Sequence, residues 1–211
     1  FHTSFVASIC AAKEKCEGEG FTSARSRCKI LLCHRKGDED VKILIFADSH
    51  GYNVSMACAV EREAPDMVLH LGDHADDARE LESVFPQLVV RGVRGNNDFF
   101  DRSVPDHLVV TPGGVRIFLT HGHREQVYSR EGDMVARLAR EEGCSLAFFG
   151  HTHRMSLAWQ HGVLVCNPGS ISLPRGGAPG YARLTIEEGR ARLLELLDED
   201  GELLRHEKIT G

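Results

Sequence analysis

The chain has 211 residues and a formal charge of −6 at neutral pH, so it can bury a substantial core in one domain of ordinary size. Its mild acidity and the lack of any run rich in lysine and arginine argue against stable binding to nucleic acid. No apolar stretch is long enough to span a bilayer, so the sequence also argues against a membrane partner.

The first 40 residues differ in character from the rest. They show neither helical nor strand periodicity, and glycine, serine and charged residues stand where a core element needs apolar ones. We therefore expect an N-terminal extension over 1–40, either non-native or disordered, and a folded domain over 41–211. One hypothesis makes Val41 the natural initiator, read from a GTG codon, because 36–39 back-translate to a purine-rich string typical of a ribosome-binding site. A genuine disordered arm and a cloning remnant are the alternatives.

The seven cysteines indicate a reducing environment. Their count is odd, they form no compact framework, and the apolar run over 5–12 lacks the preceding basic residue of a secretory signal. We therefore expect a cytoplasmic protein, with Cys58, Cys144 and Cys166 in its core. A zinc site built from the four cysteines of the first 40 residues and His34 is an alternative, although the two-residue spacing of a zinc knuckle is absent.

Beyond residue 41 the apolar pattern alternates between strand and helix. It predicts strands over 41–47, 67–71 and 87–91, with helices over 52–63 and 76–85 between them. A hairpin over 108–110 and 115–119 follows, then a helix over 130–142 and strands over 146–149, 157–160, 163–166, 181–186 and 190–197. A parallel half followed by a hairpin-rich half predicts an α/β fold of two mixed β-sheets packed face to face with helices on the outside, an α/β/β/α sandwich.

Polar motifs follow the apolar runs at five points, where a strand ends and a loop begins. They read Asp48-Ser49-His50, Gly72-Asp73, Gly95-Asn96-Asn97-Asp98, Thr120-His121-Gly122-His123 and Gly150-His151-Thr152-His153. Strand ends converge along one edge of such a fold, so we expect these side chains to meet. Carboxylates and imidazoles from several strand ends, with one carboxylate to bridge, are what two hard metal ions require.

The five motifs, in this order and spacing, resemble those of the calcineurin-like metallophosphoesterase superfamily. The resemblance covers 41 to about 197, and it is closest to the small single-domain phosphodiesterase branch, which also includes the retromer scaffold subunit. The run Asn167-Pro168-Gly169-Ser170 also resembles this branch. The resemblance implies that 41–211 is a metallophosphoesterase domain.

The resemblance also implies a ligand set for two metal ions. One ion would be held by Asp48, His50 and His153, and the second by Asn96, His121 and His151, with Asp73 bridging the two. A bridging carboxylate reduces the repulsion between two dications that lie about 3.5–4 Å apart. Imidazoles with carboxylate oxygens, and no thiolate, make Mn²⁺ the expected ion, with Fe²⁺, Zn²⁺, Ni²⁺ or Mg²⁺ as alternatives.

Further residues near the motifs are expected to assist. Asp98 is interpreted as an acceptor that orients a ligand, and His123 and His74 as residues that reach the substrate. Many members of the superfamily place a histidine after the ligand asparagine, where it can protonate the leaving group; here that position is Asn97, which we assign to substrate binding. The catalytic set is then Asp73, Asn96, His121, Asp98 and His123. His70 is interpreted as a hydrogen-bonded core residue, and His107, His161 and His206, with His74, as surface residues.

These motifs predict a dinuclear metal hydrolase, and the resemblance implies a phosphoesterase, specifically a phosphodiesterase, in which a water or hydroxide that bridges the two metals attacks phosphorus. The expected partner is a small-molecule phosphate ester, and the branch commonly forms homo-dimers or homo-tetramers. The alternative is a non-catalytic metal-binding scaffold or interaction subunit of retromer type, which would be expected to lose ligands. A dinucleotide-binding domain is excluded because no Gly-x-Gly-x-x-Gly follows the first strand.

The lack of apolar periodicity in the first 40 residues generates a prediction. Protein that begins at residue 41, with Met in place of Val41, loses few core contacts and should melt within a few degrees of the full chain. Its metal content and specific activity should match those of the full chain in parallel assays. A large drop in melting temperature would contradict the hypothesis that Val41 is the natural initiator.

Overall fold

The computed structural model describes residues 40–210, and its first strand, β1 (Val41–Phe46), begins where the predicted domain begins. The expected extension and the zinc site suggested within it lie outside the described residues, apart from Asp40. Among the helices of the described part, none combines the length and the apolar character needed to cross a membrane.

Within residues 40–210, the first sheet has six strands. Their order is β11 (Leu203–Lys208), β10 (Arg190–Asp198), β9 (Gly180–Glu187), β1, β2 (Met67–His70) and β3 (Val89–Gly92). The strands β1, β2 and β3 run parallel, whereas β9 is antiparallel to both β1 and β10, and β10 to β11. Parallel neighbours need a crossover, which α2 (Asn53–Glu63) and α3 (Ala75–Val84) supply.

The second sheet of the described part has five strands. Their order is β4 (His107–Val110), β5 (Ile117–Thr120), β6 (Leu146–Phe148), β8 (Val163–Pro168) and β7 (Met155–Gln160). The predicted hairpin is β4 with β5, and its turn contains the short helix η2 (Pro112–Gly114). Two helices, α4 (Val127–Arg130) and α5 (Asp133–Glu141), connect β5 to its parallel neighbour β6.

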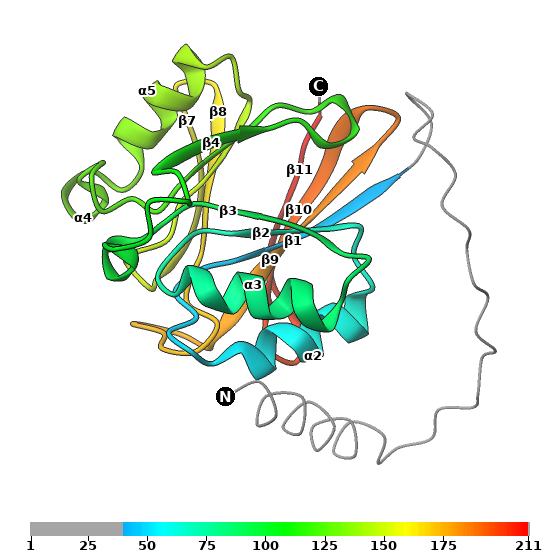
Figure 1. Ribbon diagram of the computed structural model, residues 1–211. Helices are drawn as coiled ribbons and strands as arrows, with labels where there is room; N and C mark the ends of the chain where they lie inside the picture. The colour runs from blue at the N-terminus through cyan, green and yellow to red at the C-terminus, as the bar shows by residue number, and fades with distance from the viewer. Residues whose placement is uncertain (1–39, 211) are drawn as a thin grey trace.

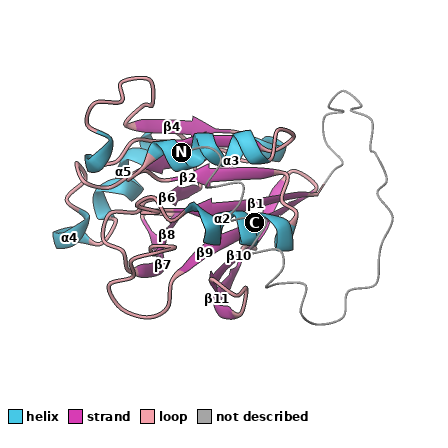
Figure 2. Ribbon diagram, turned by 60° about the horizontal axis from the view of Figure 1, so that its bottom comes forward, coloured by secondary structure: helices cyan, strands magenta, loops and turns pink. Residues whose placement is uncertain are grey.

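Among the described residues, three apolar clusters hold four layers together. Side chains alternate along β1, so Ile43 and Ile45 pack between the two sheets, whereas Leu44 and Phe46 pack under α2 and α3. A third cluster joins α5 to the outer face of the second sheet. Figure 1 shows the two sheets between these helices, and Figure 2 shows the same layers from a second direction. The predicted sandwich of two mixed sheets is confirmed.

The structure differs from the prediction at two places. The helix expected over 130–142 is α5, which begins only at Asp133 because Gly132 adopts φ 89°, and the short helix α4 that precedes it was not predicted. The edge strand β11 was not predicted; most of its residues are exposed, so its sequence lacks the alternation that marks a half-buried strand. It is positioned by its ladder with β10.

Candidate metal centre

The predicted motifs meet where strand ends of both sheets come together. Asp48 and Asp73 follow β1 and β2 of the first sheet, and His121 and His151 follow β5 and β6 of the second. The backbone N–H of Asp48 donates to the Gly72 carbonyl oxygen at 3.1 Å, which ties the first two loops together. Segments more than a hundred residues apart in the chain therefore supply one site.

One compact group contains the expected ligands of the first ion. Candidate ligand atoms of Asp48, His50, Asp73 and His153 all lie within 4.8 Å of one another. The Nε2 atom of His153 is 3.4 Å from Asp48 Oδ1 and 3.3 Å from His50 Nε2. The Nε2 atom of His50 is 3.8 Å from Asp73 Oδ2. These atoms surround a space of the size that a single ion needs.

The expected ligands of the second ion lie on the other side of Asp73. The Nε2 atom of His121 is 3.4 Å from Asp73 Oδ1 and 3.1 Å from Asn96 Oδ1. The ring of His151 is half-buried, and its centroid lies 5.0 Å from that of His121. Asp73 thus lies between the two groups, which is the position a bridging carboxylate requires.

The tautomers of two histidines follow from their backbone contacts. His121 Nδ1 is 2.8 Å from the Leu71 carbonyl oxygen, and His153 Nδ1 is 2.7 Å from that of Leu173. A carbonyl oxygen only accepts, so each Nδ1 carries the proton and each Nε2 presents a lone pair to the carboxylates. Lone pairs aimed at carboxylate oxygens are repulsive unless a cation lies between them, and this backbone arrangement is the usual one for metal-binding histidines.

The charges of the site also favour a bound cation. Asp48 is fully buried, and burial, reinforced by the charge of Asp73, raises the pKa of its carboxyl well above the usual range. Within residues 40–210 neither carboxylate forms an ion pair with a lysine or arginine. Burial lowers the pKa of the four imidazoles, to about 4 in His121, so they are neutral ligands at neutral pH. The donor set therefore fits divalent metal ions.

Backbone strain is concentrated at the same positions. Five of the seven expected ligands adopt a left-handed conformation, with φ between 47° and 66°: Asp48, His50, Asp73, His151 and His153. Residues other than glycine seldom adopt this conformation, and they keep it only where the surrounding contacts enforce it. Such strain typically marks functional sites, since it aims side chains that a relaxed loop would leave apart.

Asn97 lies against the carboxylate of Asp73. Its backbone N–H donates to Asp73 Oδ1 at 2.9 Å, and its side-chain Nδ2 donates to Asp73 Oδ2 at 2.8 Å. The sequence assigned Asn97 to substrate binding, but the structure gives it a further role that the sequence did not indicate. It fixes the orientation of the carboxylate that both groups share.

Asp98 lies in the short helix η1 (Asn96–Asp98), and its contacts are to backbone groups. Its carboxylate accepts from the N–H groups of His74 at 3.0 Å, Ala75 at 2.8 Å and Gly95 at 2.8 Å. It therefore fixes the loops that carry Asp73 and Asn96. This position is compatible with the predicted role of Asp98 as an acceptor that orients a ligand, which stays a prediction.

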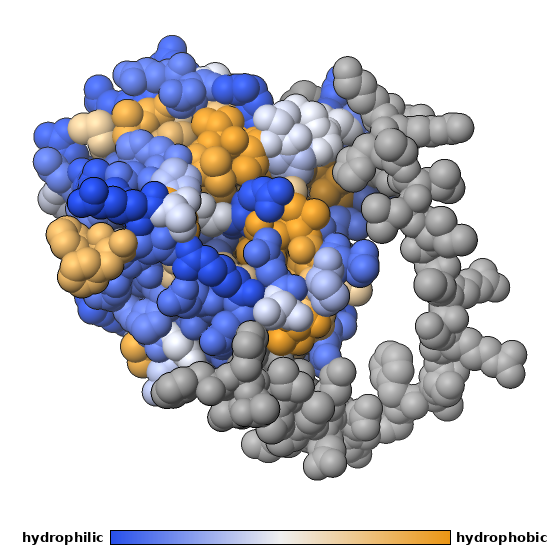
Figure 3. Space-filling model, viewed as in Figure 1, coloured by the Kyte–Doolittle hydropathy of each residue, from blue (hydrophilic) through white to orange (hydrophobic). Residues whose placement is uncertain are grey.

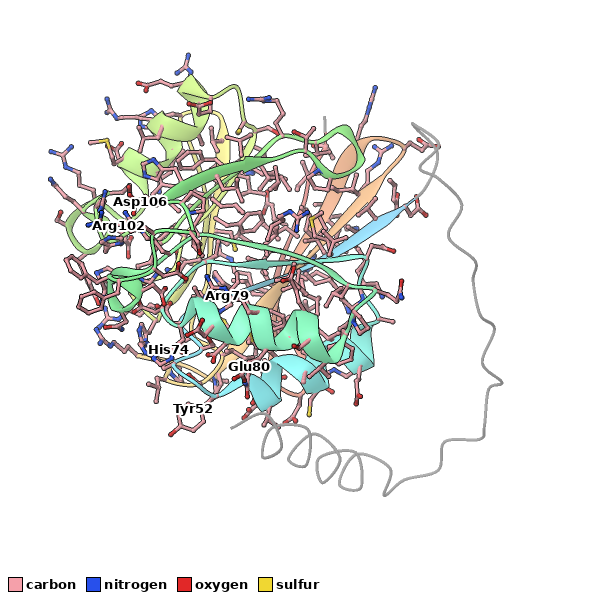
Figure 4. The ribbon with its side chains drawn as sticks, in the orientation of Figure 1. Tyr52, His74, Arg79, Glu80, Arg102 and Asp106 are labelled. Atoms are coloured by element: carbon pink, nitrogen blue, oxygen red, sulfur yellow. The ribbon has the colours of Figure 1, made fainter. Side chains whose placement is uncertain are left out.

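His123 and His74 flank the two groups. The half-buried ring of His123 lies 5.4 Å from that of His121, and its buried Nδ1 atom has no hydrogen-bond partner among the described residues. His74 is exposed, as predicted; its ring lies 5.6 Å from that of His50, and Figure 4 shows it at the periphery of the molecule. Their predicted contact with substrate stays a prediction.

A buried network below the first group includes one residue that the sequence did not single out. Asp77 Oδ2 accepts from Ser49 Oγ at 2.6 Å and from the Gly51 N–H at 2.8 Å. His70 is buried, and its Nε2 lies 3.0 Å from the same hydroxyl, which confirms its assignment as a hydrogen-bonded core residue. Asp77 stands beside Asp76 in an ordinary helix, so no sequence signal distinguishes it.

The motif that begins at Asn167 holds two ligand loops. Asn167 Nδ2 donates to the Gly150 carbonyl oxygen at 2.8 Å and to Thr152 Oγ1 at 3.0 Å, on either side of His151. Ser170 Oγ donates to the Asp48 carbonyl oxygen at 2.7 Å. The motif therefore supports the site without contributing a ligand.

Comparison with known proteins agrees with this geometry. The model of the calcineurin-like phosphoesterase superfamily domain matches residues 41–189. The chain is also 34% identical over 154 residues to the probable metallophosphoesterase YsnB of Bacillus subtilis (strain 168). That match covers 72% of this chain and 88% of the relative.

Solved structures share the fold. A conserved protein described as a predicted phosphoesterase, from Streptococcus pneumoniae TIGR4, matches with a TM-score of 0.66 and 28% identity, over 81% of this chain and 99% of that one. Vacuolar Protein Sorting 29 from Cryptosporidium parvum matches with a TM-score of 0.64 and 20% identity, over 84% of this chain and 100% of that one. At 20% identity the likeness establishes the fold alone.

The repulsion around Asp48 predicts opposite effects of one substitution on the metal-free and metal-loaded protein. Asp48→Asn removes a buried like charge and offers an N–H to His153 Nε2, so the metal-free protein should melt about 2–5 °C higher. Addition of Mn²⁺ should raise the melting temperature of the wild type by more than that of the variant, because a bound ligand stabilises only the state that binds it and the variant keeps a complete set of expected ligands for the second ion alone.

The control is Asp200→Asn, an exposed aspartate whose side chain makes no hydrogen bond in the described structure. It should melt and respond to Mn²⁺ like the wild type in differential scanning calorimetry. A metal-free Asp48→Asn protein that melts below the wild type would contradict the electrostatic argument.

Proposed function

The chain belongs to the calcineurin-like phosphoesterase superfamily, and we propose that it is a metal-dependent phosphodiesterase acting on a small-molecule phosphate ester. The observation that carries the proposal is the complete set of seven donors at one edge of the fold. Two buried carboxylates and two oriented lone pairs there support the binding of cations. Mn²⁺ is the ion we propose, since imidazole with carboxylate oxygen suits it.

Each donor has a proposed role. Asp48, His50 and His153 would hold one ion, and Asn96, His121 and His151 the other, with Asp73 as the shared ligand. Bound ions supply positive charge that polarises a phosphate ester and lowers the pKa of water. The protein contributes fixed geometry, because Asn97 holds Asp73 and backbone carbonyls hold two of the imidazoles.

The chain lacks an obvious general acid that would transfer a proton to the leaving group. An amide cannot act as a general acid, and Asn97 already donates to Asp73. His123, whose ring lies 5.4 Å from that of His121, is an imidazole that is not an expected ligand, and burial lowers the pKa of its ring, so it is mostly neutral at neutral pH. We therefore propose that diesters with good leaving groups are the preferred substrates.

The alternative, a non-catalytic scaffold or interaction subunit of retromer type, rests on the fold. A scaffold has no need of two carboxylates buried against each other or of strained ligand loops, and the present site keeps both. A cytoplasmic location and a homo-dimer or homo-tetramer remain proposals drawn from the sequence.

Metal dependence tests the proposed activity directly. Full-length protein loaded with Mn²⁺ should hydrolyse bis(p-nitrophenyl) phosphate, and it should lose this activity after chelation and dialysis. Asp73→Asn should lower turnover by about 10³-fold or more, because both ions share this ligand. A screen of phosphomonoesters and of linear and cyclic diesters would define the preference. Undiminished turnover without metal would refute the proposal.

The variant Asn97→His tests whether the lack of a general acid limits the rate of hydrolysis. The histidine introduces a titratable donor beside the second group, and general acids contribute about 10²–10⁴-fold, so esters with poor leaving groups should gain relative to good ones. The measurement is kcat/KM over aryl phosphodiesters of graded leaving-group pKa, where the dependence should become shallower.

Asn97→Ala is the matched control, since it removes the hydrogen bond to Asp73 without adding an acid. It should lower kcat/KM for every ester by a similar factor. Equal slopes for the histidine variant and the wild type would show that another group already protonates the leaving oxygen.

A further inference from the structure

A cavity of about 640 Å³ lies beside the candidate metal centre. Asn96 and His123 form part of its wall, and Arg124 and the segment between η1 and β4 form much of the rest. Cavities of this size accommodate whole organic ligands, and a phosphate group fills only a small part of one. An ester whose phosphate lies at the expected ligands would extend its remaining part into this cavity.

The cavity carries an excess of positive charge. Arg94, Arg102, Arg124 and Asp106 line it, which gives three cationic side chains and one anionic one. Asp106 accepts from Arg94 Nε at 2.6 Å and from Arg124 Nη1 at 2.8 Å, and the bond from Arg94 lowers the pKa of the Asp106 carboxyl. Two charges remain uncompensated in a chain whose formal charge is −6. Such a wall favours an anionic ligand.

Arg102 is the arginine of this wall whose side chain is available to a ligand. Across residues 40–210 its side chain forms no hydrogen bond or ion pair, whereas Arg94 and Arg124 are both held by Asp106. Figure 4 shows Arg102 and Asp106 together, away from α3. A guanidinium without partners keeps all of its donors available for a phosphate, which it can bind with two parallel hydrogen bonds.

The segment around Arg102 is fixed on both sides. Arg79, on α3, donates to Asp101 and also to Ser103 Oγ, the latter at 2.8 Å. The Ser103 N–H donates to Asp101 Oδ1 at 3.0 Å. Arg102 is therefore anchored at its backbone while its side chain stays unengaged, an arrangement suited to binding.

An aromatic surface adjoins the same wall. Phe99 lines the cavity with 74% of its surface exposed, and Phe100 is 93% exposed, with ring centroids 5.2 Å apart in an edge-to-face pair. Figure 3 shows hydrophobic surface at the left of the molecule, in the region of η1, among hydrophilic neighbours. Paired exposed rings commonly mark a place where another ring packs.

We propose that this cavity binds the non-scissile part of a nucleotide, with a second phosphate on Arg102 and the base against Phe99. The proposal rests on the proposed function only in placing the scissile phosphate at the metal ligands. It names a substrate class that the family alone does not supply, because substrate choice depends on the site and not on the fold.

Binding tests the proposal without requiring turnover. Full-length, Mn²⁺-loaded protein should bind thymidine 3′,5′-bisphosphate about tenfold more tightly than thymidine 5′-monophosphate in titration calorimetry, the effect expected of one guanidinium–phosphate contact. Arg102→Gln should abolish this preference and leave the affinity for the monophosphate unchanged. Phe99→Ala should weaken both nucleotides about fivefold or more and leave binding of inorganic phosphate unchanged.

Arg190→Gln is the matched control, because Arg190 is also exposed and forms no ion pair with any described residue, but lies at the end of β10 that is remote from the site. It should keep the preference for the bisphosphate. Equal affinities of the wild type for the two nucleotides, or a preference that survives Arg102→Gln, would overturn the proposal.

Hydrolysis assays distinguish nucleotide binding in the cavity from the proposed phosphodiesterase activity. Thymidine 5′-(p-nitrophenyl phosphate) is compared with the same ester carrying a 3′-phosphate, and the latter should have the higher kcat/KM in the wild type alone and not in Arg102→Gln. Selective binding of the bisphosphate without hydrolysis of either ester would support the cavity assignment and refute the phosphodiesterase. Equal hydrolysis of both esters by both proteins would refute the cavity assignment and support the phosphodiesterase.

Discussion

Two carboxylates, Asp48 and Asp73, are buried at neighbouring strand ends, and no lysine or arginine of the described residues is paired with either. Like charges in a poorly solvated place repel strongly, so this pair is unfavourable by itself. The lone pairs of His121 and His153 point into the same space, and the loops that aim them are strained. Each of these costs is offset by the same event, the binding of cations, so the features depend on one another.

The side chains that hold the ligands and their loops in place are uncharged for a related reason. Asn97 holds Asp73, while Asn167 and Ser170 hold the loops of His151 and Asp48, all through amide or hydroxyl groups. A lysine in the place of Asn97 would neutralise Asp73 and compete with a metal for its oxygens. An amide fixes the carboxylate and leaves its charge available, which is what a ligand bound to two ions needs.

The sequence predicted the layers and the meeting of the motifs because both depend on regular features. Short apolar runs that end in polar residues mark buried parallel strands, and the ends of such strands come together whatever their loops contain. Individual side-chain partners have no such regularity. Asp76 and Asp77 are neighbours on α3, yet one is exposed and the other receives two hydrogen bonds beneath the site. Likewise β11 is held by its pairing with β10, which its own exposed residues do not reveal.

The metal centre and the adjoining cavity are built by different parts of the chain. The expected ligands follow strands of both sheets, whereas the cavity wall comes largely from the segment between η1 and β4, fixed by Arg79 and by Asp106. The helix η1 joins them, since Asn96 and Asn97 contact the ligand groups and Phe99 follows directly. Residues such as Phe99 and Arg102 can therefore change without moving a ligand. This separation explains in physical terms why membership of the superfamily defines the chemistry of the site while the substrate must be inferred from the cavity.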